Sequence, residues 1–381
     1  MRINWIVALA LACVMSTGCR GESMDKLKQG GVVMTEFKNH LRTLCFGRVL
    51  IDVPEESLID KSWETFVPPV GRFYVDARNI TEDEFRQRMA LIETGLQNKE
   101  NNAHTPLFIS AVTPQEDPLA RIIVQRTEQG SFGKTLAEES SVYVLTYRLI
   151  GGNLFHIKQE IYAEYSSARH DFLPFSQSKL DQSLRDGYAL LARIQPLADG
   201  QIPTQPGYCV DHGFIPDFNE SVSTGMSFRL KEYPGFWFSM EDSDGRVDSA
   251  EATSAEAPSP AEQSQAADRL PARMKNLESA MGLVKLTVDI KKLVPLGPKT
   301  IGPYAGQTML WRNSLPDHAR DLFGEWEYPG SPSNPYLHIQ FDDSSVNPET
   351  GQRYAKEMPE QDVTALWFRM LESLRPRPNA R

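Results

Sequence analysis

The stretch Gly207-Tyr208-Cys209-Val210-Asp211-His212-Gly213-Phe214-Ile215-Pro216 repeats the frame of an earlier stretch, Cys45-Phe46-Gly47-Arg48-Val49-Leu50-Ile51-Asp52-Val53-Pro54. Each has a cysteine, a basic residue three positions later and an isoleucine three positions after that. Two further pairs follow in the same order: Phe-His-Ile-Lys at 155–158 with Leu-His-Ile-Gln at 337–340, and Leu-Ala-Arg-Ile-Gln-Pro at 191–196 with Leu-Glu-Ser-Leu-Arg-Pro at 371–376. The kept order predicts two related domains in tandem.

The spacing of these pairs predicts the domain boundaries. Cys45 lies 151 positions before Pro196 and Cys209 lies 167 before Pro376, so the second copy is 16 residues longer. Residues 248–267 contain no aromatic or large aliphatic side chain, and such a segment cannot bury enough apolar surface to fold. We therefore predict domains at 38–196 and 207–376, a linker at 197–206 and a disordered insertion at 248–267. A chain of 381 residues is a usual length for two domains.

Hydrophobic periodicity predicts the same mixture of elements in both domains. Thr81 and Glu84 form a capping-box pattern at the start of a helix, and Gly151-Gly152 marks a tight hairpin. In the first domain we predict strands at 45–53, 71–77, 107–112, 121–125, 142–149 and 154–163, and helices at 82–99 and 177–194.

The second domain repeats this order. Strands are predicted at 226–230 and 236–240 around a turn at Tyr233-Pro234-Gly235, then at 284–290, 307–312, 325–328 and 336–341, with helices at 270–281 and 360–374. The predicted fold class is α+β, with each domain a mostly antiparallel sheet packed with two or more helices.

The first 19 residues have the pattern of a bacterial export signal, with one positive charge, a short apolar run and small residues before Cys19. Ser16-Thr17-Gly18-Cys19 resembles a lipobox, which predicts lipidation of Cys19; an ordinary cleaved signal is the alternative. Residues 20–37 would be a tether. Arg20, where inner-membrane retention would use Asp, favours the outer membrane, facing the periplasm.

Two cysteines remain in the exported chain, Cys45 and Cys209. In an oxidising compartment they are the one possible structural pair. They form either a disulfide that joins the starts of the two domains or two buried thiols at equivalent core positions.

Motifs for catalysis, metal binding or cofactor binding are missing from the sequence. It has no Gly-x-Ser-x-Gly nucleophile turn, no His-Glu-x-x-His or paired Cys-x-x-Cys, and no phosphate-binding glycine loop. We predict no catalytic residue, no metal and no cofactor. A net charge of −10 also argues against a nucleic-acid partner, because phosphates would be repelled. His156 and His338, at matching strand positions, are expected to make a repeated structural hydrogen bond.

Two aromatic segments with nearby acidic residues are candidates for binding a protein partner, because rings anchor protein interfaces and acidic groups steer basic partners. The alternative is an aromatic-rich core with solvated acidic loops. The candidate residues are Tyr233, Phe236, Trp237, Glu241, Asp242, Asp244, Trp326 and Tyr328.

The segments 45–54 and 207–216 resemble the domain starts of the Tli4-type immunity proteins of type VI secretion systems, and the resemblance covers about residues 38–376. It implies a two-domain periplasmic protein that binds a lipase-type toxin, covers its active-site entrance or lid, and protects the producing cell. Such an inhibitor needs no catalytic residue. A periplasmic ligand-binding or envelope-assembly lipoprotein is the alternative function.

Overall fold

The computed structural model describes residues 40–59, 64–67, 70–102, 104–128, 139–166, 171–173, 175–218, 220–244, 289–314, 319–331, 334–347 and 349–380. The predicted signal with Cys19, the tether at 20–37, the insertion at 248–267 and the helix at 270–281 lie outside these residues. In the part of the chain that is described, no helix is both long and apolar enough to cross a membrane.

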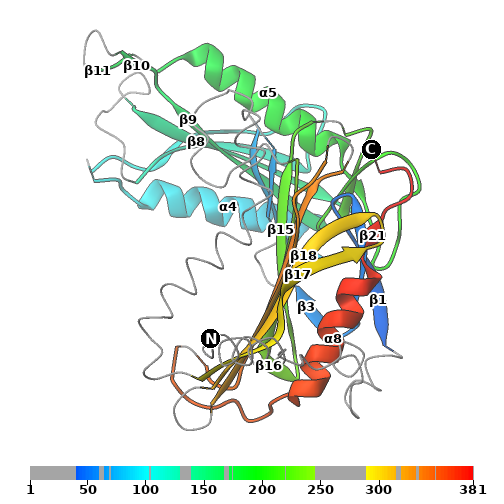
Figure 1. Cartoon of the computed structure of the whole chain (residues 1–381). Helices are drawn as coiled ribbons and strands as arrows, with labels where there is room; N and C mark the ends of the chain where they lie inside the picture. Colours follow the sequence, from blue (N-terminus) through cyan, green and yellow to red (C-terminus); the bar gives the residue numbers. More distant parts are fainter. Residues whose placement is uncertain are drawn as a thin grey trace, which may run out of the picture.

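The first half of the chain contains two long helices and a run of antiparallel strands (Figure 1). The helices are α4 (Glu82–Asn98) and α5 (Gln177–Arg193). The strands are β1 (Leu41–Phe46), β2 (Val49–Pro54), β3 (Ser57–Ile59), β4 (Glu64–Val67), β5 (Gly71–Ala77), β6 (Phe108–Val112), β7 (Ala120–Arg126), β8 (Ser141–Ile150), β9 (Asn153–Tyr162), β10 (Tyr165–Ser166), β11 (Asp171–Phe172) and β12 (Gln195–Pro196).

The second half repeats this plan with longer strands and, among its described residues, one helix, α8 (Glu360–Ser373). Its strands are β13 (Gly207–Val210), β14 (Gly213–Pro216), β15 (Ser223–Leu230), β16 (Tyr233–Ser243), β17 (Asp289–Ile301), β18 (Tyr304–Ser314), β19 (Arg320–Tyr328), β20 (Tyr336–Ser344) and β21 (Arg375–Pro376).

The two halves share one continuous sheet. Its order is β17-β18-β19-β20-β16-β15-β4-β5-β9-β8-β7-β6, and β3 also pairs with β15. Counted outward from the β4–β15 junction, both sides have the same strand order. The prediction of an α+β chain with two related domains in tandem is confirmed, and each half is called a repeat below.

The predicted helix cap and the predicted hairpin turn of the first repeat are both present in the structure. Thr81 Oγ1 accepts a hydrogen bond from the Glu84 amide at 3.2 Å, and Glu84 Oε2 accepts one from the Thr81 amide at 2.7 Å. Gly151 and Gly152 have φ of 56° and 80° in the β8–β9 turn. The capping box and the glycine hairpin are therefore confirmed.

Two local predictions are wrong. The segment 45–53 is a hairpin, not one strand, because Gly47 reverses the chain with a φ of 54°. Only glycine fits there, since a Cβ would overlap the Asp242 carboxylate. The turn predicted at 233–235 lies at Lys231 and Glu232, and Tyr233 already starts β16.

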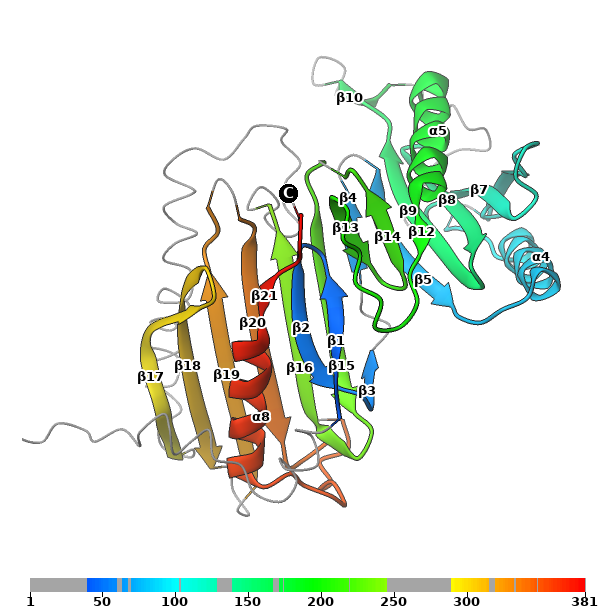
Figure 2. The same cartoon turned by 90° about the vertical axis from the view of Figure 1, so that its right-hand side faces the viewer.

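The repeats exchange their first hairpins. Hairpin β1–β2 belongs to the first repeat in sequence, but it pairs with β21 at the end of the second repeat. Hairpin β13–β14 begins the second repeat and pairs with β12, the end of the first. Figure 2 shows β1 and β2 beside α8 in front of the second-repeat strands, and β13 and β14 near β4 and β5. Each structural unit is therefore built from both halves of the sequence.

Side-chain packing follows the exchange. Phe46 and Ile51, both fully buried, belong to the apolar core of the second repeat together with Phe238 and Trp367. Burying an aromatic and a branched aliphatic side chain contributes several kcal/mol, on the order of 2–3 kcal/mol each.

The second hairpin is likewise buried in the apolar core of the first repeat. Tyr208 and Ile215 of the second hairpin pack with Phe155 and Leu191 of the first repeat. Neither repeat thus has a complete core without the hairpin of the other.

The two exchanged hairpins are fastened to each other. A disulfide joins Cys45 and Cys209, whose Cα atoms are 5.9 Å apart. Gly47 and Cys209 also exchange two backbone hydrogen bonds of 3.1 and 3.0 Å. Both sulfurs lie in a buried cluster with Leu50 and Phe214, which protects the bond from solvent.

The segment predicted as a linker, 197–206, is held by the C-terminal end. Arg377, 2 % exposed, donates hydrogen bonds to the carbonyls of Pro203, Gln205 and Gly207. Its own amide binds the carbonyl of Arg48 at 2.9 Å. The connection between the repeats is therefore fixed by buried polar contacts.

Removing the disulfide should lower stability markedly. Replacing both Cys45 and Cys209 by Ala frees a loop with a sequence separation of 164, and the added chain entropy of the unfolded state costs about 2–5 kcal/mol. Urea unfolding followed by tryptophan fluorescence measures the change. Reduced wild-type protein should match the double variant, and equal stability of oxidised protein and double variant would contradict the prediction.

Candidate functional site

The continuous sheet is covered unequally on its two sides. Helices α5 and α8 and both exchanged hairpins pack on one side. At the junction, the hydroxyls of Thr65 and Thr224 meet on this side at 2.7 Å. Helix α4 lies on the other side, where Phe85 and Met89 pack on Ile123 of β7.

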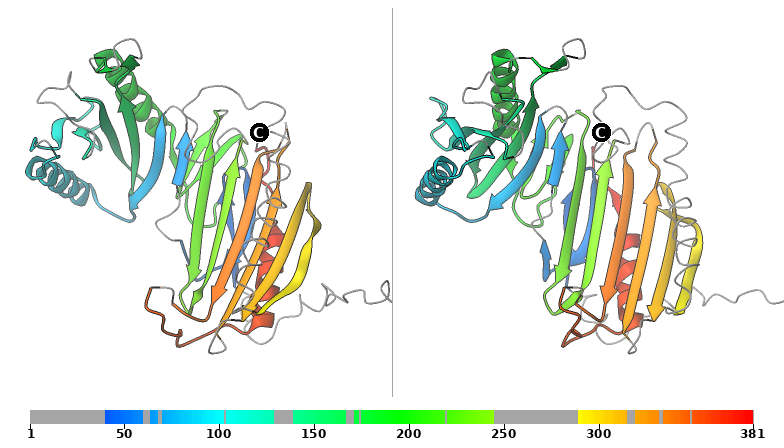
Figure 3. Two further views of the ribbon diagram at one scale, coloured as in Figure 1. Left: turned by 60° about the vertical axis from the view of Figure 1, so that its left-hand side comes forward. Right: turned by 90° about the vertical axis from the view of Figure 1, so that its left-hand side faces the viewer.

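This arrangement defines the central face: the side of β9, β5, β4, β15, β16 and β20 that points away from α5 and α8. Figure 3 (right) shows α8 behind the strands of the second repeat, so the face toward the viewer is the one opposite α8. On this side α4 covers the ends of β9 and β5 at Leu154 and Ala77. Over the rest of the six strands the described residues place no helix on the central face, which is formed by both repeats.

One row of side chains crosses the central face through the junction of the repeats. Gly225 is paired with Glu64 on one side and with Glu241 on the other. Paired residues on neighbouring strands point to the same side of a sheet. The row runs His156, Tyr74, Glu64, Gly225, Glu241 and His338.

The two histidines of the row stand at equivalent distances from the junction, and each contacts a carboxylate of a neighbouring strand. His156 Nδ1 lies 3.1 Å from Asp76 Oδ2, and its ring stacks on Tyr74 and Tyr147 with centroids 5.1 and 4.8 Å away. His338 Nε2 lies 2.7 Å from Glu325 Oε1. Both rings are thus held in place by contacts with a neighbouring strand.

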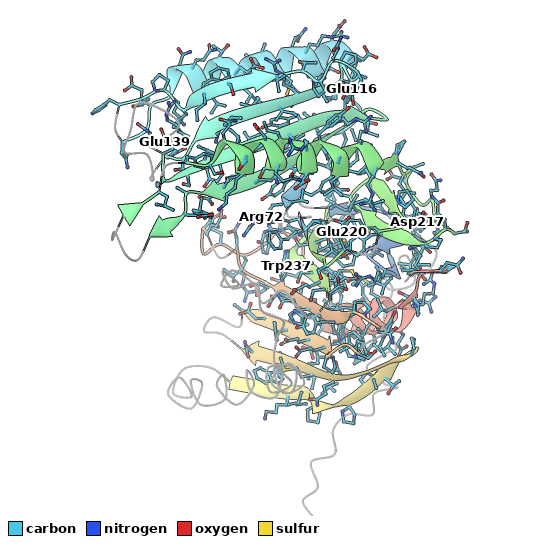
Figure 4. The ribbon with its side chains drawn as sticks, turned by 90° about the horizontal axis from the view of Figure 1, so that it is seen from above. Arg72, Glu116, Glu139, Asp217, Glu220 and Trp237 are labelled. Carbon is cyan, nitrogen blue, oxygen red and sulfur yellow. A yellow bond between two sulfur atoms is a disulfide. The ribbon has the colours of Figure 1, made fainter. Side chains whose placement is uncertain are left out.

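The middle of the central face is a floor of small side chains. Ser223 and Gly225 lie on β15, and a Cβ added to Gly225 would meet only the Met240 carbonyl oxygen, at 3.9 Å. Arg72 on β5, 55 % exposed, forms an ion pair of 2.7 Å with Glu64. In Figure 4, Arg72 and Trp237 lie to the left of Asp217 and Glu220.

A second row lies on the part of the face formed by the second repeat. Asp342 on β20 is paired with Trp237 on β16 and with Phe323 on β19. All three side chains are partly exposed. Burial raises the pKa of Asp342 to about 6, and the negative charges of Asp321, Asp343 and Glu325 act in the same direction.

Asp343 also has a pKa raised to about 6 by burial, but it faces the opposite side of β20, where the Arg320 guanidinium binds it and opposes the shift. Among the described residues, no cation pairs with Asp342 in the way that Arg320 pairs with Asp343. Asp342 therefore carries an uncompensated negative charge between two aromatic rings.

A third perturbed carboxylate lies where the exchanged hairpins meet the sheet. Asp242 is fully buried and accepts the Arg48 amide at 2.8 Å. Arg48 also contacts Asp244 at 2.5 Å, and its guanidinium lies 5.3 Å from the centre of the Tyr208 ring. Burial raises the pKa of Asp242 to about 6, while Arg48 opposes the shift. This cluster holds the first hairpin in place.

The described residues contain no group of three or more His, Cys, Asp or Glu side chains able to hold a metal ion. What the geometry offers is a broad, preformed surface, and the comparisons with known proteins bear on its use. Residues 42–198 match the family model of the Tle cognate immunity protein 4 N-terminal domain, and residues 201–379 match that of its C-terminal domain. The chain belongs to the Tle cognate immunity protein 4 family.

Solved structures show the same fold over nearly the whole chain. One is a chain of the Tle4–Tli4 complex, with a TM-score of 0.61 at 18% identity, covering 90% of this chain and 99% of that chain. Another is the apo immunity protein TplEi of the T6SS from Pseudomonas aeruginosa, with a TM-score of 0.59 at 18% identity and coverage of 89% and 98%.

The TplEi structure with an "L" peptide gives a TM-score of 0.55 at 19% identity, covering 90% of this chain and 99% of that chain. No match was found among curated protein sequences. The agreement with the Tli4 family therefore extends over both repeats and includes their arrangement.

The structure shows which of the eight predicted partner-binding residues are exposed and which are buried. Five of the eight are buried in the core, which is the alternative that the sequence left open: Tyr233, Phe236, Asp242, Trp326 and Tyr328. Side chains that are at most 7% exposed offer a partner little surface to contact, so burial argues against a direct role in binding for these five. The cause is strand alternation, since Phe236 and Phe238 point toward α8 whereas Trp237 points away.

The other three candidates differ in their surroundings. Trp237 and Glu241 lie on the central face and are partly exposed, so their role in binding stays a prediction. Asp244 is partly exposed but is held by Arg48 at the hairpin seam.

Sequence reasoning missed other surface residues, among them Arg72 and Tyr74; the acidic pair Asp342-Asp343 is recognisable in the sequence as a run that could steer a basic partner, but without its place beside Trp237. Arg72 and Tyr74 alternate with the buried Phe73 in a correctly predicted strand. This alternation was an available signal that two polar or amphipathic groups share one face. The pairing of Asp342 with Trp237 depends on the register of β16 and β20, which no local motif encodes.

Stability is expected to rise as the pH falls from 7.5 to 5. The pKa of Asp242 in the folded protein, about 6, lies above the ordinary value near 3.9, so the folded state binds the proton more tightly than the unfolded state. This contribution is complete at low pH and disappears as the pH rises through about 6. Asp342 and Asp343 act in the same direction.

Thermal melts of wild type and Asp242→Asn between pH 5 and 7.5 measure this effect. The variant should show a weaker dependence on pH because the titrating group is gone. Asp83→Asn, at a side chain that is 84% exposed, serves as the control and should keep the wild-type slope. A wild-type melting temperature that rises steadily from pH 5 to 7.5 would refute the expectation.

Proposed function

We propose that this immunity protein binds a phospholipase effector of a type VI secretion system through its central face and inhibits it sterically, without catalysis. Binding would cover the entrance to the effector's active site or hold its lid closed. The effector would then be unable to hydrolyse membrane phospholipids in the producing cell and its kin.

The main support is membership of the Tli4 family over both repeats. A structure with the same fold has been solved in a Tle4–Tli4 complex, and its chain is covered to 99%. A binding role also suits the chemistry, because the described residues carry a wide surface formed by both repeats and no metal-binding cluster. Acidic groups on that surface fit a partner with basic groups.

The rigid connection between the two repeats also supports inhibition by simple binding. The repeats share a continuous sheet, a disulfide and the buried contacts of Arg377. A preorganised surface loses little conformational entropy on association, so more of the contact energy remains as affinity. We infer that the protein binds as one body and not as two domains that close around the effector.

We also propose that the protein works in the periplasm, anchored by a lipid at Cys19. The export-signal pattern of residues 1–19 supports this placement, and so does the Cys45–Cys209 disulfide, because such bonds persist in oxidising compartments. Anchoring near the membrane would raise the concentration of the inhibitor where a phospholipase acts. Mass spectrometry of the membrane fraction tests the lipid at Cys19.

The central test combines the chain from Arg20 onward with the lipase encoded beside its gene. Calorimetry measures the affinity, and phospholipid hydrolysis in the same mixtures measures inhibition. Stoichiometric binding with loss of hydrolysis supports the proposal. Failure to bind would refute it.

The position of the binding surface is tested by Gly225→Arg. Gly225 lies at the middle of the floor, and a Cβ there meets no atom closer than 3.9 Å, so the fold should tolerate the new side chain. An arginine projecting from the floor should keep the effector away from the sheet. We expect at least a 100-fold loss of affinity, measured by calorimetry, with an almost unchanged melting temperature.

Ala189→Arg is the matched control. Ala189 is an exposed residue of α5, on the side of the sheet opposite the central face, so affinity should stay within about twofold of wild type. If Gly225→Arg binds like wild type, the central face is not the binding surface.

A further inference from the structure

We propose that Trp237, Asp342 and Phe323 together form a recognition site for one basic side chain of the effector, an arginine by preference. The inference rests on the proposed function, because it assigns a specific contact within the effector complex. It also states the chemistry of the partner, a planar cation presented to the second repeat.

The geometry places the three side chains in one row. Asp342 is paired directly with Trp237 on one side and with Phe323 on the other. Directly opposed residues in antiparallel strands have Cβ atoms about 4.5–5.5 Å apart on the same side of the sheet. The carboxylate of Asp342 thus stands between two aromatic side chains on a partly exposed surface.

The charged groups that shift the pKa of Asp342 are all negative, although the row also carries two cations, Arg229 paired with Trp237 and Lys292 paired with Trp311. Asp321 and Glu325 lie near enough to raise the pKa of Asp342, and no positive group opposes them. Asp321 is occupied by a hydrogen bond of 2.6 Å from Ser344, and Glu325 by His338. Asp342 is thus the member of this group whose charge has no counterpart among the described residues.

A carboxylate between two aromatic rings suits an arginine better than any other side chain. Its guanidinium is planar, stacks on aromatic faces and donates two parallel hydrogen bonds to a carboxylate. Trp is the best aromatic partner for a cation, and Trp237 lies beside the carboxylate. A lysine would also pair with Asp342 but would lose the stacking on the rings.

The neighbouring aspartate on β20, Asp343, shows how such a buried carboxylate is paired with an arginine inside the protein. Asp343, on the other side of β20, is bound by Arg320, which also donates a hydrogen bond of 2.7 Å to the Met358 carbonyl. Of these two neighbouring aspartates, the more buried Asp343 is bound by an internal arginine, whereas Asp342 forms no ion pair with any described residue. The effector would supply the missing cation.

The test uses the chain from Arg20 onward with Asp342→Asn or Trp237→Ala, and calorimetry against the lipase encoded beside the gene. Asp342→Asn keeps the shape and removes the charge. We expect a 10- to 100-fold loss of affinity for each variant and a weaker dependence of affinity on salt for Asp342→Asn. The melting temperature of Asp342→Asn at pH 7.5 should equal or exceed that of wild type, because an uncompensated charge is removed.

The double variant separates a shared contact from two independent ones. If both side chains hold the same cation, the loss in the double variant is smaller than the product of the single losses. Asp181→Asn on α5, a partly exposed aspartate on the opposite side of the sheet, is the charge-matched control and should bind like wild type.

The outcomes distinguish this site from the proposed function. Wild-type binding together with affinities within twofold for Asp342→Asn and Trp237→Ala overturns the site alone. Absence of binding by wild type overturns the proposed function and the site with it. Losses in both single variants, with wild-type binding by Asp181→Asn, establish the site.

Discussion

The reciprocal exchange of hairpins is the constraint on which the rest of the structure depends. Phe46 completes the core around Trp367, and Tyr208 completes the core around Leu191, so each repeat is stable only in the presence of the other. The Cys45–Cys209 bond and the contacts of Arg377 fix the same region. Because both hairpins lie on the α5 and α8 side, none of the described hairpin residues covers the central face.

That surface carries groups that do little for folding. Glu64 and Arg72 form an ion pair, but Asp342 is a partly buried carboxylate that forms no ion pair with any described residue, and burial raises its pKa to about 6. Such a charge lowers the stability of the free protein. Proteins often keep unfavourable groups where a partner relieves them, and the contrast with Asp343 indicates that the second repeat tolerates this cost on one side of β20 only.

The sequence allowed much of the fold to be predicted, because repeats, capping boxes and glycine turns are local or self-similar. Thr81, Gly151 and Gly152 have the predicted roles. The exchange could not be predicted, since both hairpins carry similar apolar patterns and no local motif says which core each one completes. The site was predicted only in part for a related reason: adjacent residues such as Phe236 and Trp237 face opposite sides, and the side that is buried depends on where α8 packs.

The exchanged hairpins also bear on how such a chain can arise. A single ancestral repeat with this topology would lack part of its core, and two identical copies would complete one another by swapping their first hairpins. Fusion of the two genes would preserve the pairing while releasing the copies to diverge. The central row records that divergence, since the positions of Tyr74 and Glu64 in one repeat correspond to Glu241 and Gly225 in the other. A duplicated scaffold thereby acquires a face whose two halves differ, so each half can contact a different part of a partner.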